Sequence, residues 1–203
     1  EFDRCMETEQ NTPHHCYTVG EHTLQSLLNI RADKVLRLTM LLHDFGKPFV
    51  KRTDENGRDH FKTHGPEGEK MAVSILRRLK MDNDTIRKVR SLIKWHDFRP
   101  KGDAVSVRKA ISMIGEELFP LYLEVQRADI LAQSLYKREE KLKRLSSVKA
   151  LYKEIMDRGE CISLKTMALT GRNLIDAGYA PGKELGEILE RLLAHVLENP
   201  EDN

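Results

Sequence analysis

The sequence has few cysteines, few aromatic residues and no strong excess of charge of either sign. Its three cysteines show neither paired spacing nor the density of a disulfide scaffold. Aromatic residues make up 6% of the 203 residues, and a formal net charge of +2 does not by itself indicate a nucleic-acid partner. A signal-like start and a long apolar run are both absent, so we expect a cytoplasmic protein with no membrane partner. The chain begins with Glu1, which is consistent with a piece of a longer polypeptide.

Helix-forming residues dominate the composition, and strand signals are nearly absent. Hydrophobic residues are 39% and charged residues 33%, which is typical of a helix-rich globular domain. Apolar periodicity predicts helices that begin after Thr18, after Asp33, at Pro66, after Asp82 or Asp84 and after Ser106, with two more over 118–133 and 137–158. We therefore predict an all-α fold. It comprises a polar, irregular N-terminal arm over 1–17, a main helical domain over 18–160 and a Gly-containing tail of short helices over 161–203.

The predicted helix after Asp33 has almost no polar face and ends at His43-Asp44. Such a helix is expected to be buried and to deliver these two side chains to a site. Gly46 fits a C-terminal stop, and Pro48 is expected to prevent continuation. Residues 49–63 read as a polar loop or short hairpin.

His43 and Asp44 have companions elsewhere in the chain that complete a metal-ligand set. We predict that His22, His43, Asp44 and Asp129 bind a divalent ion, because imidazole and carboxylate together form a hydrolytic metal site. His64 and His96 are candidate ligands of a second ion that shares Asp44. Mixed nitrogen and oxygen ligands leave the metal open among magnesium, manganese, iron, nickel, cobalt and zinc.

Other polar residues near these positions have predicted supporting roles. Lys47 can neutralise a phosphate, and we expect Asp44 and Lys47 to be the catalytic residues. Arg127 is predicted to bind substrate beside Asp129, and Asp97 to orient His96. Solvated or structural roles are expected for His60 and His195, while His14 and His15 could line the mouth of the pocket.

Several segments carry a family resemblance. They are 10–24 (QNTPHHCYTVGEHTL), 41–48 (LLHDFGKP), 127–129 (RAD), 169–175 (LTGRNLI), Gly178 and 181–186 (PGKELG). This pattern resembles the HD superfamily of metal-dependent phosphohydrolases. More closely, it resembles the HD domain and C-terminal tail of bacterial CCA-adding tRNA nucleotidyltransferases, of the poly(A) polymerase family.

The resemblance implies an HD-domain helical bundle with a small helical tail. It implies the ligands His22, His43, Asp44 and Asp129, and it matches His64 and His96 to the extra histidines of the two-metal branch. The Gly-Ser and Asp-X-Asp motifs of the nucleotidyltransferase head are missing; Asp82-Asn83-Asp84 has the spacing but reads as a helix cap.

Two classes of function follow, and the sequence leaves the oligomeric state open. The first is a phosphohydrolase with one or two divalent ions, acting on 2′,3′-cyclic or 2′-phosphates of nucleotides or tRNA 3′ ends, and not a nucleotidyltransferase by itself. The alternative is the tRNA-binding body and tail of a truncated or split CCA-adding enzyme, which basic clusters at 77–80 and 141–144 support. A free-nucleotide hydrolase is a third alternative.

Overall fold

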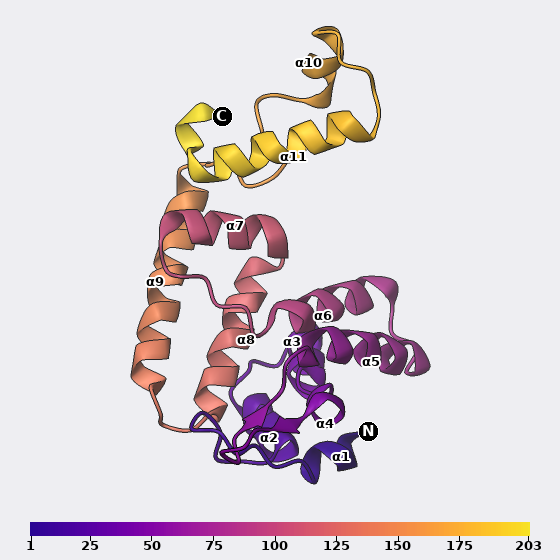
Figure 1. Ribbon diagram of the computed structural model, residues 1–203, viewed down its shortest axis with the longest axis vertical. Coiled ribbons are helices and arrows are strands. Elements are labelled where there is room, and N and C mark those ends of the chain that lie inside the picture. Colours follow the sequence, from indigo (N-terminus) through magenta and orange to yellow (C-terminus); the bar gives the residue numbers. More distant parts are fainter. The chain divides into compact units, whose positions relative to one another are not determined.

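The computed structural model describes residues 1–203, and helices account for nearly all of its regular structure (Figure 1). The all-α prediction is confirmed, with one short two-stranded sheet added. The elements are α1 (Phe2–Met6), α2 (Val19–Leu28), α3 (Lys34–Leu42), α4 (Lys47–Val50), β1 (Arg52–Thr53), β2 (Asp59–His60), α5 (His64–Arg78), α6 (Asn83–Trp95), α7 (Ala104–Ile114), α8 (Phe119–Ala132), α9 (Arg138–Asp157), α10 (Gly171–Asp176), α11 (Lys183–Glu198) and a 3₁₀ turn, Pro200–Asp202.

The chain divides into two compact units. Unit 1 comprises Glu1–Arg99 and Glu117–Leu145, and unit 2 comprises Pro100–Glu116 and Ser146–Asn203. The arm, domain and tail boundaries expected from the sequence stay predictions. None of the helices combines the length and the hydrophobicity that a membrane-spanning segment requires.

Three helix starts in unit 1 follow directly from their capping residues. Thr18 accepts a hydrogen bond from the backbone of Glu21, whose side chain in turn accepts one from the backbone of Thr18. Asp33 and Asp82 cap α3 and α6 through carboxylates that accept from the backbone N–H groups of Leu36 and Thr85, without the reciprocal bond. Each cap satisfies backbone N–H groups that would otherwise lack a partner, so these predicted boundaries are confirmed.

The core of unit 1 surrounds α3. Helices α5 and α6 lie side by side, and both belong with α1, α2 and α3 to one apolar cluster (Figure 1). Leu36 and Met40, on another face of α3, pack with Val125 and Ala128 of α8 in a second cluster. Burying one such side chain contributes about 1.5–3 kcal/mol relative to exposure. Contacts on two faces explain why the sequence of α3 has so little polar surface.

The end of α3 differs from the prediction. Its C-cap is His43, and after a turn the chain continues as the short helix α4, with Pro48 in its first turn. Gly46 has an ordinary right-handed backbone conformation and is not a C-terminal stop. A Cβ at Gly46 would lie 2.3 Å from the backbone oxygen of His64. Glycine is therefore needed for the close approach between this turn and α5.

Two other helix starts were misplaced by the sequence reading. α5 begins at His64, two residues before Pro66, and its N-cap Thr63 has a positive φ of 68°. α7 is capped by Asp103, whose carboxylate accepts from the backbone N–H of Ser106. Ser106 is thus the third helical residue and not the cap. Both errors arise because Pro and Ser are common at several positions of a first turn.

The arm and the tail contain more helix than expected. Residues 2–6 form α1, whose Cys5 is fully buried in the core of unit 1. Gly186 lies inside the 16-residue helix α11 and does not interrupt it. In unit 2, α11 packs on α7 and on α10, and Cys161 is buried with Met167 and Val196.

Candidate metal centre

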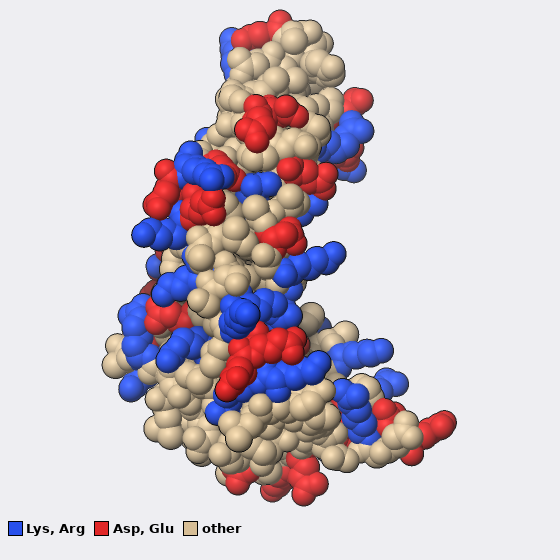
Figure 2. All heavy atoms as spheres, turned by 90° about the vertical axis from the view of Figure 1, so that its left-hand side faces the viewer, with Lys and Arg blue, Asp and Glu red and all other residues tan.

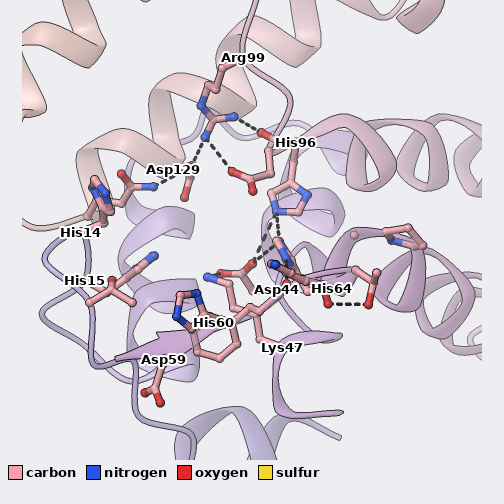
Figure 3. Close-up of a pocket in the computed structure, with 18 of the residues that line it drawn as sticks. His14, His15, Asp44, Lys47, Asp59, His60, His64, His96, Arg99 and Asp129 are labelled. Atoms are coloured by element: carbon pink, nitrogen blue, oxygen red, sulfur yellow. Dashed lines mark hydrogen bonds and ion pairs between the residues drawn. The ribbon is translucent and has the colours of Figure 1, made fainter. Parts of the chain in front are cut away.

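A pocket of about 650 Å³ opens in unit 1, and polar side chains line it (Figure 3). Asp44, His64, His96 and Asp129 face it directly, while His22 and His43 are fully buried. The six predicted ligands come from α2, the end of α3, α5, the end of α6 and α8. The fold brings all six together, with Asp44 at the centre.

The first group joins two imidazoles with two carboxylates. The Nε2 atoms of His22 and His43 lie 3.3 Å apart. Asp44 Oδ2 is 3.6 Å from the first of these nitrogens and 3.3 Å from the second. Asp129 Oδ1 lies 3.0 Å from His22 Nε2. Donor atoms of His22, His43 and Asp44 all lie within 4.8 Å of one another, which suits ligands of one cation.

The second group uses the other oxygen of Asp44. His64 Nε2 and His96 Nε2 each lie 3.6 Å from Asp44 Oδ1, and they are 3.1 Å from each other. Burial and the neighbouring His96 lower the pKa of His64 to about 4, which keeps its imidazole neutral near pH 7. One carboxylate therefore faces two pairs of histidines, the arrangement of a bridging ligand.

The Nδ1 atoms of the four histidines all contact backbone carbonyl oxygens. Those of His43, His64 and His96 lie 2.7, 2.8 and 2.6 Å from the carbonyl three residues earlier in the chain. For His22 the partner is the carbonyl of Ala132, at 3.3 Å. A carbonyl oxygen only accepts hydrogen bonds, so Nδ1 carries the proton. The lone pair of Nε2 therefore points toward the other candidate ligand atoms. These rings are oriented as metal-binding histidines are.

Asp44 is buried, and neither of its oxygens accepts a hydrogen bond of good geometry. Lys47 Nζ forms an ion pair with Oδ2 at 2.7 Å. Burial alone would raise the pKa of Asp44, but His43 and Lys47 outweigh it and hold the pKa well below its usual value. A buried carboxylate with unfilled acceptor positions beside four oriented imidazoles fits a divalent cation.

Asp129 is held by residues that the sequence reading missed. Arg99 and Gln133 donate to its Oδ2 at 2.9 and 3.0 Å, which leaves Oδ1 directed at His22. Burial would raise the pKa of Asp129, but His22 and Arg99 lower it well below the usual value. Arg99 also donates to the carbonyl of His96, so it links the two donor groups (Figure 3). No motif marks Arg99, because its partner is 30 residues away.

The other predicted residues are placed as follows. Lys47 is buried and bonds to Asp44 and to Gln10, so its ammonium group already has partners. Arg127 is exposed on α8 and does not line the pocket. Asp97 pairs with Arg99 at 3.6 Å and does not orient His96. The catalytic and substrate-binding roles expected of Asp44, Lys47 and Arg127 stay predictions.

Two histidines of the arm line the pocket, whereas His195 lies outside it and pairs with Asp202. His15 packs edge-on against His22, with ring centroids 5.0 Å apart. Burial, with Lys47 and His22 nearby, lowers the pKa of His15 to about 3. His60 lines one wall, where it pairs with Asp54.

Positive side chains surround the donor groups. Those that line the pocket are Lys47, Arg58, Lys62, Lys94, Arg99, Lys141 and Arg144. Lysine and arginine in this position attract phosphate groups. The same pocket is also lined by Asp44, Asp59, Asp97 and Asp129. On the face that carries α9, side chains of both charges are interspersed (Figure 2).

Comparison with known proteins relates the chain to one part of tRNA nucleotidyltransferases. Residues 66–203 match the family model described as tRNA nucleotidyltransferase domain 2. The chain is 30% identical over 177 residues to an A-adding tRNA nucleotidyltransferase of Deinococcus radiodurans, covering 85% of this chain and 40% of that protein. It is 29% identical over 187 residues to a CC-adding tRNA nucleotidyltransferase of Thermus thermophilus, covering 88% and 41%. No solved structure matches significantly.

These findings correct the predicted activity. The sequence reading made the chain a metal-dependent phosphohydrolase. That prediction is wrong, because the matched family and both relatives are tRNA nucleotidyltransferases. The motifs around His43 mark a set of candidate metal ligands, and such a set alone does not specify the reaction.

The chain spans about two fifths of the length of these relatives. The family match covers more than half of the chain, which therefore belongs to the tRNA nucleotidyltransferase domain 2 family.

Proposed function

We propose that this chain is the tRNA-binding body and tail of a tRNA nucleotidyltransferase of the CCA-adding kind. The observation that carries the proposal is the family match, which extends from residue 66 to residue 203 and so includes the tail. Both relatives are named for adding nucleotides to tRNA, and each aligns with most of this chain. The body and tail are therefore the part of such an enzyme to which this sequence corresponds.

The charge distribution supports an RNA partner. Binding to an RNA backbone depends on Lys and Arg that replace condensed counterions. Lys141 and Arg144 line the positive pocket from α9, and Lys143 lies between them in sequence on an exposed part of that helix. Such a cluster can contact phosphates even though the chain as a whole is nearly neutral.

The proposal includes a divalent ion in unit 1. His22, His43, Asp44 and Asp129 would hold the first ion, and Asp44 with His64 and His96 a second, in the pattern of the HD-superfamily resemblance. A cation bound there adds positive charge that attracts phosphate oxygens. Two observations support an ion at this place: the oxygens of Asp44 accept no hydrogen bond of good geometry, and the four imidazoles share one orientation.

Binding of a fluorescently labelled tRNA transcript, followed by anisotropy over a range of salt concentrations, tests the tRNA-binding role. We expect Lys143→Glu with Arg144→Glu to weaken binding and to reduce the salt slope by about two, since each lost phosphate contact removes about one. The matched control is Lys149→Glu with Lys153→Glu, the same charge change on exposed positions of the same helix. Absence of tRNA binding by the unmodified chain would contradict the proposal. Equal losses in the two double variants would contradict an RNA surface at 141–144.

A further inference from the structure

Buried polar atoms without a hydrogen-bond partner are concentrated in residues that line the pocket of unit 1. Five such side-chain atoms are found, and four of them belong to pocket-lining residues: Thr12 Oγ1, His15 Nδ1 and the two oxygens of Asp44. A metal ion accounts for Asp44, but nothing in the proposed ligand set uses Thr12 or His15. Leaving a buried donor or acceptor unpaired costs about 1–3 kcal/mol, so a partner for these two atoms is expected.

The backbone that carries these two residues is fixed on both sides. Before Thr12, the backbone N–H of Asn11 donates to the buried carboxylate of Asp59, and the backbone N–H of Asp59 donates to the carbonyl of Asn11. Between Thr12 and His15, the carbonyls of Pro13 and His14 accept from the side chain and the backbone of Ser134. The segment that carries the two unpaired atoms is therefore fixed beside the pocket and is not loose.

Thr12 and His15 supply a different chemistry from the rest of the rim. A threonine hydroxyl donates one hydrogen bond and accepts up to two, and a single imidazole nitrogen such as His15 Nδ1 donates or accepts one; neither carries the fixed positive charge of a lysine or arginine. The lysines and arginines of the same pocket are the groups that pair with phosphate. A ligand that fills both regions carries a phosphate and, close to it, an uncharged group that both donates and accepts. A ribose hydroxyl of a nucleotide has these properties.

We propose that Thr12 and His15 form a hydroxyl-binding subsite that recognises the ribose of a ribonucleotide whose phosphate pairs with the cations of the pocket. A subsite for the 2′-hydroxyl distinguishes RNA from DNA, because that hydroxyl is the group that differs between them. Its relevance to tRNA rests on the proposed function, whereas the subsite itself is a property of the pocket. An ordered water is the competing occupant, and it would give no preference among sugars.

The test combines ligand and protein deletions in a double-mutant cycle. The ligands are AMP, 2′-deoxy-AMP and 3′-deoxy-AMP, and their dissociation constants are measured by calorimetry with the full chain. The protein variants are Thr12→Val and His15→Phe, which keep the approximate shape and remove the polar atom. The matched control is Thr8→Val, because the hydroxyl of Thr8 bonds to the carbonyl of Arg4, and Thr8 does not line the pocket.

We expect the unmodified chain and Thr8→Val to bind AMP about 3- to 10-fold more tightly than one of the deoxy analogues, as a hydrogen bond of about 0.5–1.5 kcal/mol predicts. In Thr12→Val or His15→Phe that preference should fall to about one, with affinity for the deoxy analogue nearly unchanged. Equal affinity of the unmodified chain for all three nucleotides, or binding of none, would overturn the inference. So would a preference that survives in both variants.

The same chain in the tRNA-binding assay separates this inference from the proposed function. Tight tRNA binding without a sugar preference would contradict the subsite and leave the proposed function standing. A sugar preference without tRNA binding keeps the subsite and removes the proposed function.

Discussion

Asp44→Asn is the substitution that bears most directly on the metal centre. Oδ2 of Asp44 faces His22 and His43, and Oδ1 faces His64 and His96. Asparagine keeps the shape but removes the negative charge and one acceptor oxygen. A single change should therefore weaken both donor groups at once, which no other residue in the pocket can do.

The size of the effect follows from the linkage between binding and stability. An ion present at a hundred times its dissociation constant stabilises the folded protein by about 2.7 kcal/mol. For a chain of this length each kcal/mol shifts the melting temperature by about 2–4 °C, so saturation should raise it by about 5–11 °C. For Asp44→Asn we expect almost no shift with any of the six candidate ions.

The assay is thermal unfolding of chelator-treated protein with and without each ion, beside elemental analysis of the protein as purified. Asp59→Asn is the matched control, since Asp59 is also a buried carboxylate and pairs with Lys51 at 2.9 Å outside both donor groups. We expect it to melt lower without metal but to keep the ion-dependent rise. A rise in Asp44→Asn equal to that of the unmodified chain would refute the assignment. So would an unmodified chain that binds none of the ions.

Two further predictions concern stability. Gly46→Ala should lower the free energy of unfolding by about 1–3 kcal/mol, because the new Cβ meets the backbone oxygen of His64. Gly186→Ala should raise it by about 0.5–1 kcal/mol, because the position lies inside α11 with open space around it. Urea unfolding compares the two variants, and a change of the same sign in both would contradict the packing argument. Hydrogen bonds from Thr85 and Lys34 lower the pKa of Asp82 below 3.8, so its contribution to stability is complete above that pH and is lost as the pH falls toward the lowered pKa. Asp82→Ala should therefore lower the melting temperature near pH 7 and have less effect near pH 2, while Asp82→Asn keeps the cap; a pH-independent difference between the two would count against this cause.

Local sequence signals predicted most helices because their determinants lie within a few residues. Thr18, Asp33 and Asp82 cap helices through side chains that reach only three residues ahead. The starts of α5 and α7 were misplaced within the first turn, and the other errors came where a distant contact decides the conformation. Gly46 is glycine because α5 passes close to it, and no feature near Gly46 in the sequence shows this. Residues 2–6 form a helix because Cys5, on that helix, packs into a core made by helices that come later in the chain.

The donor residues were recognisable because their chemistry is rare and their motifs are compact, as in His43-Asp44. Their neighbours were not, since Arg99, Gln133 and Thr12 are ordinary polar residues until folding places them at the pocket. The reaction was misassigned because a set of candidate metal ligands does not specify the chemistry, which depends on the rest of the enzyme.

By itself the sequence determined the all-α class, most helix starts and the likeness to CCA-adding enzymes, and it predicted six metal ligands whose role stays a prediction. Only the tertiary structure decided that Asp44 faces both pairs of histidines, that Arg99 holds Asp129, and that two polar atoms of the arm are left without partners. The physical reason is range. Helix propensity and capping act over a few residues, whereas the pocket depends on packing between segments that are far apart in the chain.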